Sequence, residues 1–121
     1  MKEKILILDD DKDILEILTI ILSESGYEIK TLSCGDNIFE ELIQFEPNIL
    51  LMDIMIADMD GLAICREIKE NALTSSIPVI MISASHDLDK SLNLPGAPDD
   101  FLAKPFDIDF LLNKIEKYVK V

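Results

Sequence analysis

Tryptophan is absent from this 121-residue chain, and histidine and cysteine, two common ligands of transition metals, are nearly absent. Cys34 and Cys65 stand far apart, with neither a CxxC motif nor a Cys/His spacing, so we interpret them as two reduced structural thiols. The single histidine, His86, cannot supply a zinc site of ordinary ligand number. We interpret it as a surface residue rather than a phosphohistidine or a metal ligand.

Positive charge is also scarce. Only 11 Lys and Arg stand against 24 Asp and Glu, which gives a formal net charge of −13. Phosphate backbones demand Lys and Arg, so this balance argues against direct nucleic-acid binding by the domain. Acidity alone identifies no partner, because acidic surfaces often serve only to keep proteins in solution.

Long apolar runs are missing as well, since none approaches the roughly 20 residues of a membrane-spanning helix. The opening stretch, MKEKILILDDD, is too short in its apolar part for a signal peptide, and it ends in acid instead of a small-residue cleavage site. We therefore expect a cytoplasmic protein with no membrane partner. Because 49% of the residues are hydrophobic, we also expect one domain, residues 1–121, with a real core, either as a stand-alone protein or as a fragment of a longer one.

The apolar residues that are present alternate between two patterns. Continuous apolar runs, which are typical of parallel strands covered on both faces, occupy residues 4–8, 48–52 and 78–82, with weaker strand candidates at 27–32 and 100–103. Stripes with helical spacing begin near Ile14, Ile38, Leu62 and Ile108. Gly26 and Pro47 are predicted to end the first two of these helices.

Aspartates mark the expected helix starts. Asp13 and Glu16 resemble a capping box with Asp in place of Ser or Thr, and we expect Asp11 or Asp13 to cap the first helix. Asp107 is the candidate N-cap of the last helix. Residues 85–98 are ambiguous, because the leucines there fit a short helix that the following prolines must end early.

Repeated strand–helix alternation predicts a doubly wound α/β fold, with a five-stranded parallel sheet and helices on both faces. Ligands of such folds bind outside the carboxyl ends of the strands. The polar residues expected to converge at that rim are Asp9, Asp10, Asp53, Ser83 and Lys104.

Three carboxylates in one pocket either raise a pKa strongly or bind a cation. Oxygen ligands at a small site suit Mg²⁺, which often bridges to a phosphate. Capping alone is the simpler explanation for Asp9 and Asp10, but a cap needs only one carboxylate. An EF-hand loop starting at Asp9 fails, because its sixth position is Ile14 and its twelfth is Ile20. Together with Lys104 and the Ser83 hydroxyl, the acids suggest phosphoryl transfer.

The chain resembles the receiver domain of bacterial two-component response regulators over essentially its whole length. The resemblance is carried by four stretches in the family's order: ILILDDD, PNILLMDIMIADMDGL, IPVIMISA and DDFLAKPF. It implies the flavodoxin-like strand order 2-1-3-4-5. It also implies that Asp53 accepts a phosphoryl group from the phosphohistidine of a sensor histidine kinase or a phosphotransfer protein. The domain would then be a stoichiometric switch and not a turnover enzyme.

The resemblance also assigns the remaining roles. Asp10 and Asp53 would bind Mg²⁺ directly, with the backbone carbonyl of Met55, and Asp9 would hold the ion through water. Ser83 and Lys104 would contact the phosphoryl oxygens. Phe101 would be the switch aromatic that turns inward when the hydroxyl residue moves. The output partner and a homodimer are left open.

The sequence departs from the family at several points. Ala57 replaces a common proline, and Ser83 replaces the more usual threonine. Pro95 and Pro98 flank the glycine after the fourth strand, so we predict a shortened or partly unwound fourth helix near residues 88–94. Met55 and Ser85, at positions that tune phosphoryl lifetime in the family, carry no group that would position a hydrolytic water, which predicts slow to moderate self-dephosphorylation.

Three alternative functions fit parts of the sequence. The stretch DMDGL resembles the nucleophile motif of haloacid dehalogenase-type phosphatases, but it lies beyond the strand end at Asp53. A degenerate receiver, acting only as a protein-interaction module without phosphorylation, is a second alternative. A flavodoxin-like cofactor binder is disfavoured, because the loop after the first strand is acidic where a phosphate would sit.

Overall fold

The computed structural model describes residues 2–56, 59–83, 96–104 and 107–119. Five strands form one parallel sheet: β1 (Lys4–Leu8), β2 (Glu28–Leu32), β3 (Ile49–Asp53), β6 (Val79–Ser83) and β7 (Asp100–Ala103). Their order across the sheet is β2-β1-β3-β6-β7. Counted along the chain, these five strands have the predicted order 2-1-3-4-5, so the predicted fold is confirmed.

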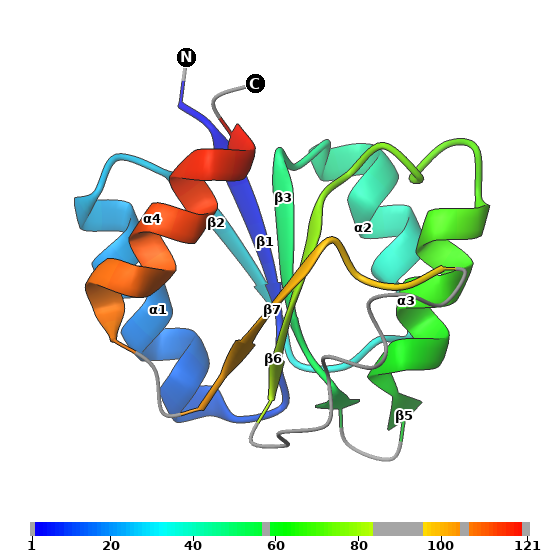
Figure 1. Ribbon diagram of the computed structural model, residues 1–121, viewed down its shortest axis with the longest axis horizontal. Coiled ribbons are helices and arrows are strands. Elements are labelled where there is room, and N and C mark those ends of the chain that lie inside the picture. The colour runs from blue at the N-terminus through cyan, green and yellow to red at the C-terminus, as the bar shows by residue number, and fades with distance from the viewer. Residues whose placement is uncertain (1, 57–58, 84–95, 105–106, 120–121) are drawn as a thin grey trace.

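In the described part of the chain, four helices cover the two faces of the sheet: α1 (Lys12–Glu24), α2 (Ile38–Phe45), α3 (Gly61–Glu70) and α4 (Ile108–Val119). In Figure 1, α1 and α4 lie on one side of the sheet and α2 and α3 lie on the other. This arrangement is the doubly wound architecture predicted from the sequence.

The core is divided by the sheet into two layers, and alternate residues of each strand face opposite layers. On β1, Leu6 and Leu8 pack in the layer that contains α2 and α3, whereas Ile5 and Ile7 pack in the layer of α1 and α4. All four side chains are buried. Burial on both faces explains why the strands appear in the sequence as continuous apolar runs.

The helix ends correct one prediction and confirm another. Asp11, not Asp13, is the N-cap of α1, since its carboxylate accepts hydrogen bonds from the backbone N–H groups of Asp13 and Ile14. The predicted capping box of Asp13 and Glu16 is therefore wrong, because Asp13 already lies inside the helix. Gly26 follows the end of α1 with a φ of 98°, a left-handed conformation that glycine adopts without strain.

A short antiparallel hairpin was not predicted. β4 (Met55–Ile56) pairs with β5 (Met59–Asp60) directly after β3, before α3 begins. The predicted fourth helix near residues 88–94 lies outside the described residues, as do Ala57, Ser85 and His86. Among the helices that the structure describes, none is long and apolar enough to cross a membrane.

Candidate functional site

Strand register brings the predicted polar residues to one rim of the sheet. Leu8 pairs with Met52, so Asp9 and Asp53 come next to each other where β1 and β3 end. Ser83 pairs with Ala103 at the ends of β6 and β7, and Lys104 follows at once. The residues therefore gather at the carboxyl ends of the strands, where ligands of doubly wound folds bind.

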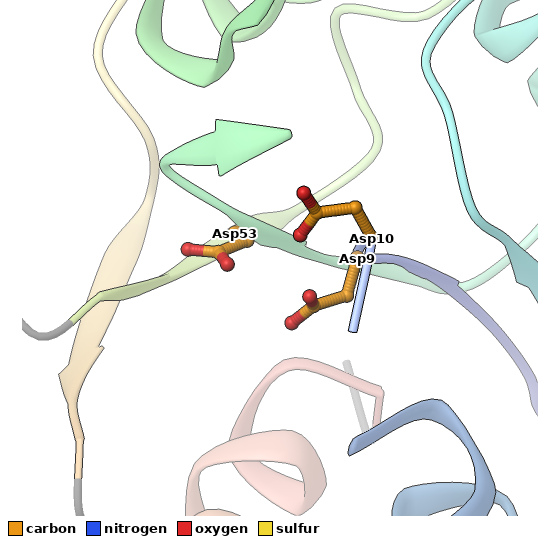
Figure 2. A group of neighbouring side chains, drawn as sticks. All are labelled: Asp9, Asp10 and Asp53. Atoms are coloured by element: carbon orange, nitrogen blue, oxygen red, sulfur yellow. The ribbon is translucent and has the colours of Figure 1, made fainter. Parts of the chain in front are cut away.

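Three carboxylates form the centre of this site. One oxygen each from Asp9, Asp10 and Asp53 lies within 4.8 Å of the others. Figure 2 shows Asp9 and Asp10 projecting from the end of β1 toward Asp53. Asp9 is buried at 2% exposure, Asp53 is partly exposed and Asp10 is exposed. The cluster thus runs from the protein interior to the surface.

Lys104 lies against the two more buried carboxylates. Its Nζ is 3.6 Å from Asp9 Oδ2 and 3.5 Å from Asp53 Oδ2. One ammonium among three carboxylates leaves a formal excess of two negative charges on these four side chains. A divalent cation is the simplest complement to that excess, and the all-oxygen donor set suits Mg²⁺.

Burial raises the pKa of the Asp9 carboxyl above its usual range, and the nearby Asp53 and Asp10 raise it further. The hydrogen bond from the Asp11 backbone N–H and the charge of Lys104 act in the opposite direction without compensating fully. The folded protein therefore favours the protonated form of Asp9 more than water does. A cation bound at the cluster would counteract this shift.

Gly61 shapes the loop that follows Asp53. A Cβ at this position would lie 2.5 Å from the carbonyl oxygens of both Asp53 and Ile54, a distance that no side chain tolerates. Gly61 instead donates its backbone N–H to Ile54 O, and Asp60 caps the N-terminus of α3. The sequence did not predict this close approach of Gly61 to the two carbonyls, although the Asp60-Gly61 pair does signal a helix start.

The remaining predicted residues are placed by their backbones. Met55 begins β4, two residues beyond Asp53, and Ser83 ends β6; their side chains lie outside the described part of the structure. Phe101 is partly buried and packs against the core layer of α2 and α3. Its partner in the sheet register is Met81 on β6. Phe101 therefore lies on the strand that leads to Lys104.

Two acids anchor the start of β7 by hydrogen bonds. Neither was predicted as a site residue from the sequence. Asp99 Oδ2 accepts hydrogen bonds from Lys69 Nζ at 2.8 Å and from the backbone N–H of Val79 at 2.8 Å. Lys69 also donates to the backbone carbonyls of Ser75 and Ile77. This lysine of α3 thus ties together the starts of β6 and β7.

The neighbouring acid is held from the opposite face. Asp100 accepts hydrogen bonds from Lys114 Nζ at 3.1 Å to each carboxylate oxygen, and from the Tyr118 hydroxyl at 3.2 Å. Tyr118 also donates to Asp99 O at 3.1 Å. Both donors belong to α4, so β7 is anchored on its two faces to two different helices.

Comparison with known proteins identifies the family to which this fold and site belong. Residues 5–116 match the family model of the response regulator receiver domain. The chain therefore belongs to the response regulator receiver domains of two-component systems, as predicted. Its phosphoacceptor function is the function of that family.

Two curated relatives are regulators of transcription. The transcriptional regulatory protein GltR of Pseudomonas aeruginosa is 34% identical over 117 residues, which cover 96% of this chain and 48% of GltR. The DNA-binding dual master transcriptional regulator RpaA of Synechocystis is 30% identical over 118 residues, covering 97% of this chain and 49% of RpaA. The chain thus spans about half the length of these curated relatives.

Solved structures support the same placement. A putative response regulator from Chloroflexus aurantiacus superposes with a TM-score of 0.89 at 25% identity, covering 100% of both chains. The signal receiver domain of a signal transduction histidine kinase from Syntrophus aciditrophicus gives a TM-score of 0.87 at 29% identity, covering 98% of this chain and 90% of that one.

Proposed function

We propose that Asp53 is the phosphoacceptor of this receiver domain. The observation that carries the assignment is the combination of charge and access at this residue. Asp9 and Asp53 both contact Lys104, but the side chain of Asp9 is 3% exposed and that of Asp53 is 15% exposed. A donor phosphate therefore has more access to Asp53 than to Asp9.

The phosphoryl donor is the phosphohistidine of a sensor histidine kinase or a phosphotransfer protein. The N–P bond of the phosphohistidine breaks, a carboxylate oxygen of Asp53 forms the new O–P bond, and the imidazole leaves with the electron pair of its nitrogen. Lys104 stands where it would compensate the charge of the incoming phosphoryl oxygens. Ser83, at the end of β6, would donate its hydroxyl to the same group. The reaction is stoichiometric, so the domain works as a switch and not as a turnover enzyme.

The carboxylate cluster would hold Mg²⁺. Its three acids offer oxygens within 4.8 Å of one another, and burial raises the pKa of Asp9. We assign Asp10, Asp53 and the backbone carbonyl of Met55 as direct ligands and Asp9 as a ligand through water. When bound, the ion would lower the repulsion between the carboxylates and the phosphate oxygens.

The output would depend on β7. Phosphorylation changes the charge next to Lys104, and the same strand carries Phe101, which is partly buried against the layer of α2 and α3. Movement of Ser83 toward the phosphoryl group would let Phe101 turn further inward and alter the surface that a partner binds. We place this switch in the cytoplasm, in the compartment of its kinase.

Intact-mass analysis after incubation with acetyl phosphate tests the assignment. We expect the wild-type protein to gain one phosphoryl group with Mg²⁺ and none with excess chelator, and Asp53→Asn to gain none. Asp36→Asn is a matched control, because Asp36 is an exposed acid in the loop after β2. Absence of phosphorylation in a folded wild-type protein would favour the degenerate interaction module. Unchanged phosphorylation of Asp53→Asn would assign the reaction to another acid.

A further inference from the structure

The backbone directly after Asp53 is held by two different elements. The Ile54 backbone N–H donates to Ile82 O of β6 at 3.2 Å, and the Gly61 backbone N–H at the start of α3 donates to Ile54 O at 2.6 Å. Both backbone polar groups of Ile54 are therefore used, one toward the sheet and one toward a helix. The position of this peptide depends on where Gly61 lies.

The hairpin of β4 and β5 extends the contact to Met55. In its antiparallel register Met55 pairs with Asp60, and Ile56 pairs with Met59. Ile56 is completely buried in the core layer of α2 and α3, so the hairpin is attached to the core. Because Asp60 directly precedes Gly61, the backbone of Met55 is also placed relative to Gly61. The carbonyl of Met55 is one of the ligands that we assign to Mg²⁺.

Only a residue without a side chain permits this approach. A Cβ at Gly61 would lie 2.5 Å from Asp53 O, 2.5 Å from Ile54 O and 2.8 Å from the Ile54 carbonyl carbon. All three atoms belong to the backbone, so no side chain can rotate away to make room. The φ of Gly61 lies outside the left-handed region, so the requirement for glycine comes from space alone.

The start of α3 is itself fixed, which determines what an added side chain would displace. Asp60 caps the helix, because its carboxylate accepts the backbone N–H of Leu62 at 3.0 Å. Three side chains of α3 are buried in the core: Ile64, Cys65 and Ile68. Moving the helix would open that core, so we expect the segment 53–55 to move instead.

We propose that Gly61 is a positioning residue for Mg²⁺ binding and for phosphoryl transfer to Asp53. It acts through the backbone of residues 53–55, which carries the Asp53 carboxylate and the Met55 carbonyl. Partners that orient metal ligands typically change metal affinity or activity by about 10- to 100-fold, although they do not touch the metal themselves. This inference rests on the assignment of Asp53 as the phosphoacceptor and of Mg²⁺ to the carboxylate cluster.

Gly61→Ala tests the proposal by two measurements. The Mg²⁺ dissociation constant is obtained from amide chemical shifts of the ¹⁵N-labelled chain without a phosphoryl donor. The rate constant of phosphorylation by acetyl phosphate is obtained from intact mass at saturating Mg²⁺. We expect the dissociation constant to rise about tenfold and the rate constant to fall about tenfold. A merely structural role would change neither, because a moderately destabilised domain remains almost entirely folded.

Gly35→Ala is the matched control, because Gly35 is also a buried glycine close to α3. A Cβ at Gly35 would meet only the ends of two side chains, Ile64 Cδ1 at 3.0 Å and Met59 Sδ at 3.2 Å. These flexible ends can shift, so Gly35→Ala should match the wild type in both measurements. Wild-type values for Gly61→Ala, or equal losses in the two variants, would overturn the proposal.

A measurement on the wild type keeps the proposal testable if Gly61→Ala does not fold. Coupling between two sites is reciprocal, so Mg²⁺ held by the segment 53–55 must in turn stabilise the contact of Gly61 with Ile54. Hydrogen exchange of the Gly61 amide should therefore slow as Mg²⁺ is added. The Gly26 amide, which donates to Ser23 O at 3.1 Å after α1, is the control and should not respond.

Exchange of the Gly61 amide that is the same with and without saturating Mg²⁺ would overturn the proposal. Failure of the phosphoacceptor assignment has a different signature. A wild type that binds Mg²⁺ but gains no phosphoryl group would refute the role of Asp53, whereas Mg²⁺ affinity and amide exchange test Gly61 without any phosphorylation.

Discussion

Lys104 Nζ lies 3.5 Å from Asp53 Oδ2, although β6 separates β3, which ends at Asp53, from β7, which Lys104 follows. Lys104 follows β7 and reaches across the end of β6 to the end of β3, where it also contacts Asp9. The lysine is thus the positive charge that holds two converging carboxylates together. The ends of β1, β3 and β7 are therefore connected through this one side chain.

Replacing Lys104 by methionine should destabilise the metal-free protein by about 1 kcal/mol, because the carboxylates lose a partly exposed ionic partner. Added Mg²⁺ should recover part of the loss, since a cation at the cluster replaces the missing charge. Thermal unfolding with chelator and with Mg²⁺ measures both effects. Lys12→Met, at the exposed start of α1, is the control and should change neither curve. Equal curves for Lys104→Met and wild type would show that the lysine does not compensate the acids.

Asp9→Asn should have the opposite effect on the metal-free protein. Burial is the main cause of the raised pKa of Asp9, so the folded state favours the protonated form. The contribution of Asp9 to stability is present below pH 3.8 and is lost as the pH rises through the higher pKa of the folded state. At neutral pH the ionised carboxylate therefore destabilises the fold.

Asparagine removes that charge and keeps the oxygen that accepts the Asp11 backbone N–H. We expect Asp9→Asn to raise the melting temperature by a few degrees in chelator and to lose most of the stabilisation by Mg²⁺. Calorimetry across a Mg²⁺ series measures both changes. A lower melting temperature in chelator would mean that the Lys104 contact outweighs burial.

The rim of the site could be predicted because its residues follow the points where buried strands stop. β1 and β3 are covered on both faces, so the first carboxylates after them must lie at the edge of the sheet. The choice between Asp11 and Asp13 as helix cap could not be made, because both have the same side chain and lie two residues apart. Only the position of the backbone after β1 decided it for Asp11.

The anchors of β7 could not be predicted for a different reason. Lys69 and Asp99 are 30 positions apart, and Lys114 and Asp100 are 14 apart. Their pairing depends on which helix packs on which face of β7, and local sequence does not encode this. The hairpin of β4 and β5 could not be predicted either, because strands of two residues are too short to show an alternation of apolar and polar residues.

The Lys69 anchor should be important for stability. Its ammonium donates to Ser75 O, Ile77 O and Asp99 Oδ2, and its side chain is only 16% exposed. Lys69→Met leaves a carboxylate and two carbonyls without this donor, so we expect a loss of about 2–3 kcal/mol in the free energy of unfolding. Urea denaturation measures the loss. Lys12→Met again serves as the exposed control, and an equally small effect of both substitutions would contradict the role of this anchor.

Tyr118 should make the fold sensitive to alkaline pH. Burial, together with the adjacent carboxylate of Asp100, raises the pKa of Tyr118 to about 12. The folded state therefore favours the neutral phenol. This contribution to stability is complete below pH 10 and is lost as the pH rises through about 12.

Tyr118→Phe should remove that part of the alkaline unfolding profile, and it should lower stability at neutral pH because Asp100 loses the donated hydrogen bond. Phenolate absorbance during a pH titration, measured in a Tyr27→Phe background, isolates the titration of Tyr118. Titration of this tyrosine at its ordinary pKa of 10 would contradict the contact with Asp100.

The two cysteines provide a measure of metal binding that does not require phosphorylation. Cys34 is exposed, whereas Cys65 is completely buried and burial raises the pKa of its thiol to about 11. At pH 8, iodoacetamide should therefore modify Cys34 rapidly and Cys65 only when the fold opens.

If the carboxylate cluster binds Mg²⁺ in the folded state alone, the modification of Cys65 should slow by the factor 1 + [Mg²⁺]/Kd, while that of Cys34 stays constant. Asp10→Asn should abolish the Mg²⁺ effect on Cys65. A rate of Cys65 modification that does not change with Mg²⁺ in the wild type would contradict Mg²⁺ binding at the carboxylate cluster.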